Sequence, residues 1–155
     1  MNKDNAIAAG IVKESDRDLM VDTVYINMRK SSISRSELML LDMLANFDWK
    51  RPIYFTQVYV LQNLGLLDYL QFDGYSYRLV PILTPYKSAW DIGRIDADYA
   101  YDKLMNKMRY GNLKDPRVYV DYFTQYNIMV SRAREAFARV AKEYIRRGDD
   151  QRAEE

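Results

Sequence analysis

The chain has 155 residues, 48% of them hydrophobic and 29% charged, so it can bury a core and is not a disordered composition. Its net charge of +1, with scattered basic and acidic residues, argues against nucleic-acid binding. It contains no cysteine and no histidine, which excludes disulfides and the Ser-His-Asp and Cys-His mechanisms, and we predict no metal or cofactor.

The first half of the sequence predicts strands alternating with helices. Residues 23–28 alternate apolar and polar side chains, which is typical of a half-buried strand. Ser34 and Glu37 have the spacing of a capping box and begin a helix that ends near Asn46. Because this helix is apolar around most of its circumference, we expect it to be packed between other elements.

Residues 52–56 predict a second, buried strand. The connection from the first strand contains a helix, and a crossover of that length favours parallel pairing. Residues 60–70 have helical spacing, Asp73-Gly74 predicts a turn, and residues 75–80 predict a third strand.

The second half of the sequence is expected to be helical. Asp96 can cap one helix, and Asp115-Pro116 predicts the start of another that reaches Arg147, with a bend at residues 124–127. The predicted fold class is therefore α/β or α+β. A small three-stranded βαβ domain over residues 1–94 precedes a helical extension over residues 95–155, and together they would form one compact unit.

The end of the chain has the spacing of a tetratricopeptide repeat. The pattern consists of a large residue, an aliphatic–small pair, a tyrosine and a later small residue, here Phe137, Val140, Ala141, Tyr144 and Ala153. An ordinary amphipathic helix that ends at a glycine is the alternative. A repeat helix needs neighbours to cover its apolar face, so we expect residues 149–155 to fray and the last helix to offer an apolar face for self-association.

Polar residues follow the predicted strands. If the strands are parallel, their carboxyl ends share one edge of the sheet. The side chains expected there include Arg29, Ser32, Thr56 and Gln57, which could receive an anion or sugar hydroxyls. The alternative is a solvated loop rim.

Trp49 and Arg51 form an aromatic and cationic corner between the helix and the second strand. An exposed Trp49 could stack on a sugar ring or bind a cation. A buried Trp49 would instead plug the junction, with Arg51 paired to a carboxylate such as Asp48 or Asp73. We favour the second interpretation.

Several motifs together resemble one family of bacterial membrane proteins. The two most specific are Trp49-Lys50-Arg51-Pro52-Ile53-Tyr54-Phe55 and Tyr77-Arg78-Leu79-Val80-Pro81. In this order they resemble the C-terminal soluble region of the domain of unknown function 2723 family, over roughly residues 5 to 153. Those proteins are similar to protein O-mannosyltransferases, which are multi-spanning enzymes that use lipid-linked sugars.

The resemblance implies a non-catalytic accessory domain on the periplasmic side of the bacterial inner membrane. It would serve its own membrane-embedded domain by positioning a protein or glycan acceptor, because no catalytic position of the family lies in this chain and no segment here is long enough to span a bilayer. A carbohydrate- or peptide-binding module is the alternative function. An independent hydrolase would have to use carboxylates.

Overall fold

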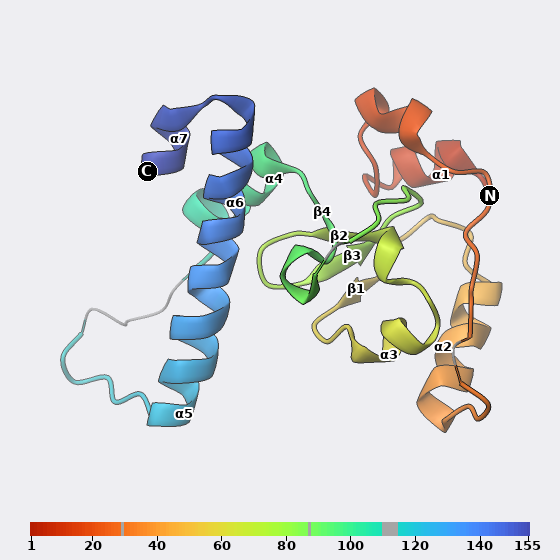
Figure 1. Cartoon of the computed structure of the whole chain (residues 1–155), viewed down its shortest axis with the longest axis horizontal. Helices are drawn as coiled ribbons and strands as arrows, with labels where there is room; N and C mark the ends of the chain where they lie inside the picture. Colours follow the sequence, from red (N-terminus) through yellow and green to blue (C-terminus); the bar gives the residue numbers. More distant parts are fainter. Residues whose placement is uncertain (29, 87, 110–114) are drawn as a thin grey trace. The chain divides into compact units, whose positions relative to one another are not determined.

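The computed structural model describes residues 1–28, 30–86, 88–109 and 115–155, with the backbone alone at residues 128–130. The chain forms two compact units. The first consists of Met1–Phe72 and Ser76–Arg94, and the second of Asp73–Tyr75 and Ile95–Glu155. Figure 1 shows the elements of both, and each unit is described by itself.

The described residues of the first unit form the α-helices α1 (Lys3–Ala8), α2 (Arg35–Ala45) and α3 (Tyr59–Asn63), and 3₁₀ helices at Glu14–Leu19 and Ala89–Asp91. The capping box predicted for α2 is confirmed, because the Ser34 side chain accepts from the Glu37 backbone N–H and the Glu37 side chain accepts from the Ser34 backbone N–H. Helix α3 covers only the start of the helix predicted over residues 60–70. That predicted segment ends in a 3₁₀ turn, Leu67–Tyr69.

The sheet has four strands in the order β1-β3-β2-β4: β1 (Tyr54–Phe55), β2 (Leu70–Phe72), β3 (Tyr77–Leu79) and β4 (Arg94–Ile95). The prediction of a parallel βαβ sheet is wrong, since β1 and β2 both pair antiparallel with β3. The Asp73-Gly74 turn was predicted, and it lies between β2 and β3. Strand β2 was not predicted, and its first residue, Leu70, was assigned to the end of the helix expected over residues 60–70. Strand β4 was not predicted.

The strand predicted over residues 23–28 is also wrong. The segment has no regular secondary structure and pairs with no strand in the described structure. Val24 and Ile26, two residues apart, both line one cavity of the core. The backbone N–H of Asn27 donates to the carbonyl of Leu64 at 3.0 Å, and that of Val21 donates to the carbonyl of Pro81 at 2.9 Å. The segment, which we call the strap (residues 21–28), is therefore held by isolated hydrogen bonds.

The core of the first unit lies among α3, the sheet and the strap. Its fully buried side chains are mostly leucine and include Leu61, Leu64, Leu66, Leu70 and Leu79. Gly65 sits between two of these leucines with a φ of +68°, and a Cβ there would lie 2.9 Å from the backbone oxygen of Asn27. Only glycine fits this close approach of the strap.

The second unit is helical. Helix α4 (Ala97–Tyr101) continues as a π-helix over Asp102–Lys107. The predicted cap is confirmed, since the Asp96 carboxylate accepts from the Tyr99 backbone N–H at 3.2 Å. Figure 1 shows a long helix running from α5 (Tyr122–Thr124) through a π-helical stretch, Gln125–Ala133, into α6 (Arg134–Arg147). Helix α7 (Asp150–Glu154) folds back from its end.

Two boundaries in this unit were predicted wrongly. The long helix begins after Asp121, whose carboxylate accepts from the Thr124 backbone N–H at 3.0 Å, rather than at Asp115-Pro116. The Asp115 carboxylate accepts from the Arg117 guanidinium at 2.7 Å instead. At the other end, residues 150–154 form α7 rather than a frayed terminus. The bend predicted near residue 125 is a widened, π-helical stretch.

The tetratricopeptide-like assignment stays a prediction. Tyr144 and Val140 of α6 are buried, and the Tyr144 ring meets that of Tyr101 edge to face at 5.9 Å. Phe137 and Ile145 of the same helix are exposed. Gly148 ends α6 in the left-handed conformation that helix C-termini commonly use.

Candidate binding surface of the first unit

The motif that begins at Trp49 lies between α2 and β1, and its first residues form a tight corner, here called the motif corner. After α2 ends, the Asp48 carboxylate accepts from the Lys50 backbone N–H at 3.1 Å, and the Asp48 carbonyl accepts from the Asn5 side-chain amide at 2.9 Å. The residue between them, Trp49, has a φ of +63°, which L-residues with a large side chain rarely adopt. The surrounding contacts therefore force the chain through a strained turn.

Trp49 is buried, with 8% of its surface exposed. Its ring lies 4.6 Å from that of Phe47, and both line a cavity of about 190 Å³ together with Leu44, Leu66 and Leu79. This burial is what the plug interpretation expects. A sugar cannot stack on the indole in this conformation, because Phe47 and the core cover it.

Arg51 lines a surface groove of about 430 Å³. The groove is lined by Asp42, Met43, Asn46, Phe47, Asp48, Arg51, Pro52 and Ile53. Within the described structure Arg51 forms no ion pair, so its expected pairing with Asp48 or Asp73 is wrong. Asp48 pairs with Lys50 at 3.0 Å instead. The guanidinium is exposed and available to a ligand carboxylate or phosphate.

Helix α2 exposes an apolar surface next to this groove. Leu38, Met39 and Met43 are exposed, with Met39 at 74%, and only Glu37 and Leu40 of the helix are buried. The prediction of a helix packed between other elements is therefore wrong. Leu38, Met39 and Met43 are here called the α2 face, and Met43 also lines the groove.

The other predicted site residues do not form one site in the described structure. Ser32, Thr56 and Gln57 are exposed, and no hydrogen bond joins any two of them. Arg29 lies outside the described residues. The argument that grouped these side chains required parallel strands, whose carboxyl ends share an edge, and the observed pairs are antiparallel.

The sequence analysis predicted that Glu37 caps α2. It did not predict that the buried Glu37 carboxylate forms the centre of a polar cluster near the strap. Glu37 accepts hydrogen bonds from the Ser34 hydroxyl at 2.7 Å and from the Asn63 amide at 3.1 Å, and it pairs with the Lys30 ammonium at 2.5 Å. The Lys30 contact, followed by the Ser34 bonds, lowers the pKa of Glu37 from 4.5 to about 2. The cluster fixes the first turn of α2 against α3.

We expect the Glu37→Gln variant to lose stability only where the native carboxylate is charged. A pKa lowered on folding adds stability that is fully present above the unfolded value of 4.5 and disappears as the pH falls through about 2. The difference in melting temperature between the native chain and the variant should therefore be largest near neutral pH and should shrink steadily below pH 4.5. A difference that stays constant down to pH 2 would contradict the assignment.

The groove does not have the electrostatics of an acid–base site. The Lys50 hydrogen bonds hold the pKa of Asp48 below its usual value, whereas a glycosidase-type general acid needs a raised pKa. Among the described residues no three acidic side chains gather as a metal site would require. The groove offers carboxylate, amide and guanidinium groups to a ligand.

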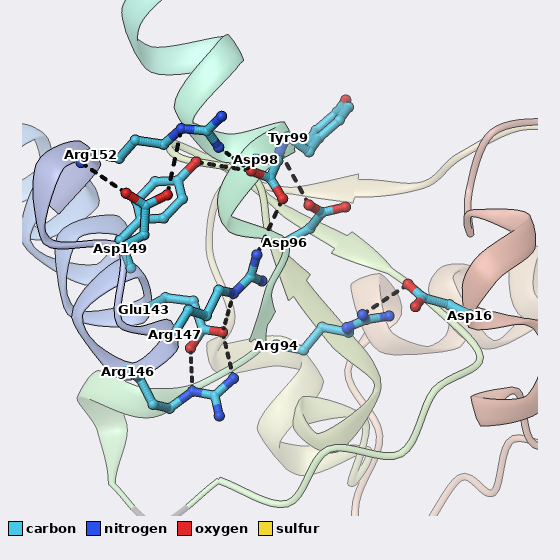
Figure 2. A network of polar contacts seen from close by, with 11 residues as sticks. Asp16, Arg94, Asp96, Asp98, Tyr99, Glu143, Arg146, Arg147, Asp149 and Arg152 are labelled. Carbon is cyan, nitrogen blue, oxygen red and sulfur yellow. Dashed lines mark hydrogen bonds and ion pairs between the residues drawn. The ribbon is translucent and has the colours of Figure 1, made fainter.

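Polar contacts in the second unit hold its helices together (Figure 2). The Asp98 carboxylate of α4 pairs with Arg147 of α6 at 3.2 Å and with Arg152 of α7 at 2.8 Å, and it accepts from the Tyr144 hydroxyl at 3.2 Å. Glu143 pairs with Arg146 at 2.7 Å and with Arg147 at 3.0 Å. These contacts are structural, since each charge has its partner within the unit.

The described residues include no helix with both the length and the apolarity that a membrane crossing requires. A family model described as TMEM260-associated domain 2 matches residues 1–99. These residues include the strap, α2, the motif corner and the whole sheet. Comparisons with curated proteins and with solved structures find no match.

Proposed function

Since this chain belongs to the TMEM260-associated domain 2 family through residues 1–99, we propose that it is a non-catalytic accessory domain of a glycosyltransferase-like membrane protein. The domain would lie on the periplasmic side of the bacterial inner membrane. There it would position an acceptor for the membrane-embedded part of the same protein. The family supports the association with a membrane protein, and the resemblance to the domain of unknown function 2723 proteins supports the finer description.

The proposal rests on one observation, the exposed α2 face beside the groove that Arg51 lines. Exposing leucine and methionine side chains to water is unfavourable, and the free energy falls when a partner covers them. Methionine adapts to irregular partner surfaces. The adjoining groove adds a free guanidinium at Arg51, which can fix orientation through a carboxylate. We infer that the membrane-embedded part of the parent protein covers this surface.

The test is binding of this chain to the separately expressed membrane-embedded part of its parent. The Met39→Glu/Met43→Glu variant should bind at least roughly tenfold more weakly, because each charge would be buried without a partner. Leu19→Glu/Leu83→Glu is the matched control, since both leucines are exposed in the same unit and lie outside the α2 face. It should bind normally. Equal loss in both variants, or no binding by the native chain, would contradict the proposal.

A carbohydrate- or peptide-binding module is the second candidate, and the composition of the groove favours it. Two carboxylates, an amide, an arginine and the Phe47 ring line one surface, as in many sugar sites. A glycan and peptide array, applied to the same chain, distinguishes the two candidate functions. Saturable binding that Arg51→Ala abolishes, with no binding to the membrane-embedded part, would select this second function.

A further inference from the structure

The second unit carries exposed aromatic side chains where its long helix begins. Four of them lie within residues 119–126, with 53% to 88% of their surface exposed: Tyr119, Tyr122, Phe123 and Tyr126, here called the aromatic patch. The rings of Tyr122 and Tyr126, one helical turn apart, stack at 6.1 Å. Aromatic side chains of this size are usually covered, and a cluster of exposed ones marks an interaction surface.

The chemistry of the patch is that of the boundary between water and lipid. Three of its four members are tyrosines, whose rings are apolar and whose hydroxyls are polar. Such side chains are enriched where a protein meets the headgroup region of a bilayer. A dry protein interface would leave the three hydroxyls to find partners, whereas headgroups and interfacial water supply them.

The stretch of sequence that contains the patch carries a net positive charge. Residues 102–135 contain seven basic and four acidic side chains, a net charge of +3, whereas the whole chain carries +1. The rest of the chain is therefore net negative. Basic side chains flanking an amphipathic segment are attracted to anionic lipids, and this attraction adds to the burial of the rings.

We propose that the aromatic patch binds the surface of an anionic phospholipid bilayer, with the rings of Tyr119, Tyr122 and Phe123 inserted at headgroup depth. The proposal concerns the second unit and does not rest on the function proposed above for the first. It needs no transmembrane helix, because interfacial insertion of aromatic side chains combined with charge attraction is enough for reversible binding.

The test is flotation of the whole chain with vesicles of phosphatidylcholine alone and with about one third phosphatidylglycerol. We expect binding to the anionic vesicles, at least roughly fivefold weaker binding to the neutral ones, and further weakening at high salt. The triple variant Tyr119→Ser/Tyr122→Ser/Phe123→Ser should bind anionic vesicles at least roughly tenfold more weakly. Circular dichroism checks that its helices are retained.

The matched control is Tyr25→Ser/Tyr59→Ser/Trp90→Ser, which removes three aromatic side chains of the first unit that are 67% to 71% exposed. This variant should bind vesicles as the native chain does. Equal loss in both triple variants would show that any exposed aromatic side chain suffices and would overturn the assignment. So would an absence of binding to anionic vesicles, or a patch-dependent dimer in solution that binds no lipid.

Discussion

The Gly65→Ala variant is expected to lower the free energy of unfolding of the first unit by about 3 kcal/mol. Two effects add. An L-residue in the left-handed region costs about 1–2 kcal/mol, and a methyl group forced against the backbone costs about 1–3 kcal/mol. The Asn27 oxygen, 2.9 Å from the new Cβ, cannot retreat freely, because the Asn27 N–H is bonded to the Leu64 carbonyl at 3.0 Å.

Gly10→Ala separates the two effects. Gly10 has nearly the same φ, +66° against +68°, but a Cβ there would meet no atom within 4 Å. This control should lose only the conformational part, about 1 kcal/mol. Urea denaturation followed by tryptophan fluorescence reports on the correct unit, since Trp49 and Trp90 both lie in it. Equal losses in the two variants would mean that the strap does not hold its position against Gly65.

The sequence predicted correctly those features in which a side chain interacts with backbone groups a few residues away. The Ser34–Glu37 capping box, the Asp96 cap and the Asp73-Gly74 turn are all formed as predicted, since each depends on a few neighbouring atoms. One prediction of this local kind was wrong. Asp115-Pro116 has the composition of a helix start, yet Asp115 pairs with Arg117 and the helix starts after Asp121.

Pairing between distant segments could not be predicted in the same way. The strap alternates like a strand but pairs with no strand in the part of the chain that the structure describes. Residues 70–72 form β2, which was not predicted, and Leu70 was assigned to the end of a helix. Apolar periodicity records which side chains face the core, and it does not record which backbone supplies the hydrogen bonds. The parallel prediction rested on connection length alone, and the antiparallel β2–β3 hairpin overrides it.

At the candidate site, too, local features were predicted correctly and the grouping of distant residues was not. The motif corner was found from its residues, and the structure places Arg51 and Asp48 in one groove. The grouping of Ser32 with Thr56 and Gln57 depended on the parallel sheet and was lost with it. The exposure of the α2 face could not be predicted, because an apolar helix in a sequence looks the same whether its cover lies in this unit or in a partner.

Replacement of Trp49 is the second change for which we expect a large loss in the free energy of unfolding. The order of stability of two replacements tests the cause. Trp49→Ala should lower the free energy of unfolding by about 4 kcal/mol, because it removes a buried ring and its contact with Phe47. Trp90→Ala is the control. Trp90 is 71% exposed, and its replacement should change the free energy of unfolding by less than about 0.5 kcal/mol.

Trp49→Gly should be more stable than Trp49→Ala by about 1 kcal/mol. At most positions glycine is the worse of the two, by about 0.5–1 kcal/mol, because it has more freedom to lose on folding. At a φ of +63° the order reverses, since alanine keeps the steric cost of the left-handed region and glycine does not. Urea denaturation followed by circular dichroism measures both variants without relying on the removed fluorophore. If alanine is the more stable replacement, the corner is free to relax once the ring is gone. The strain would then come from packing of the indole itself rather than from the backbone contacts of Asp48 and Lys50.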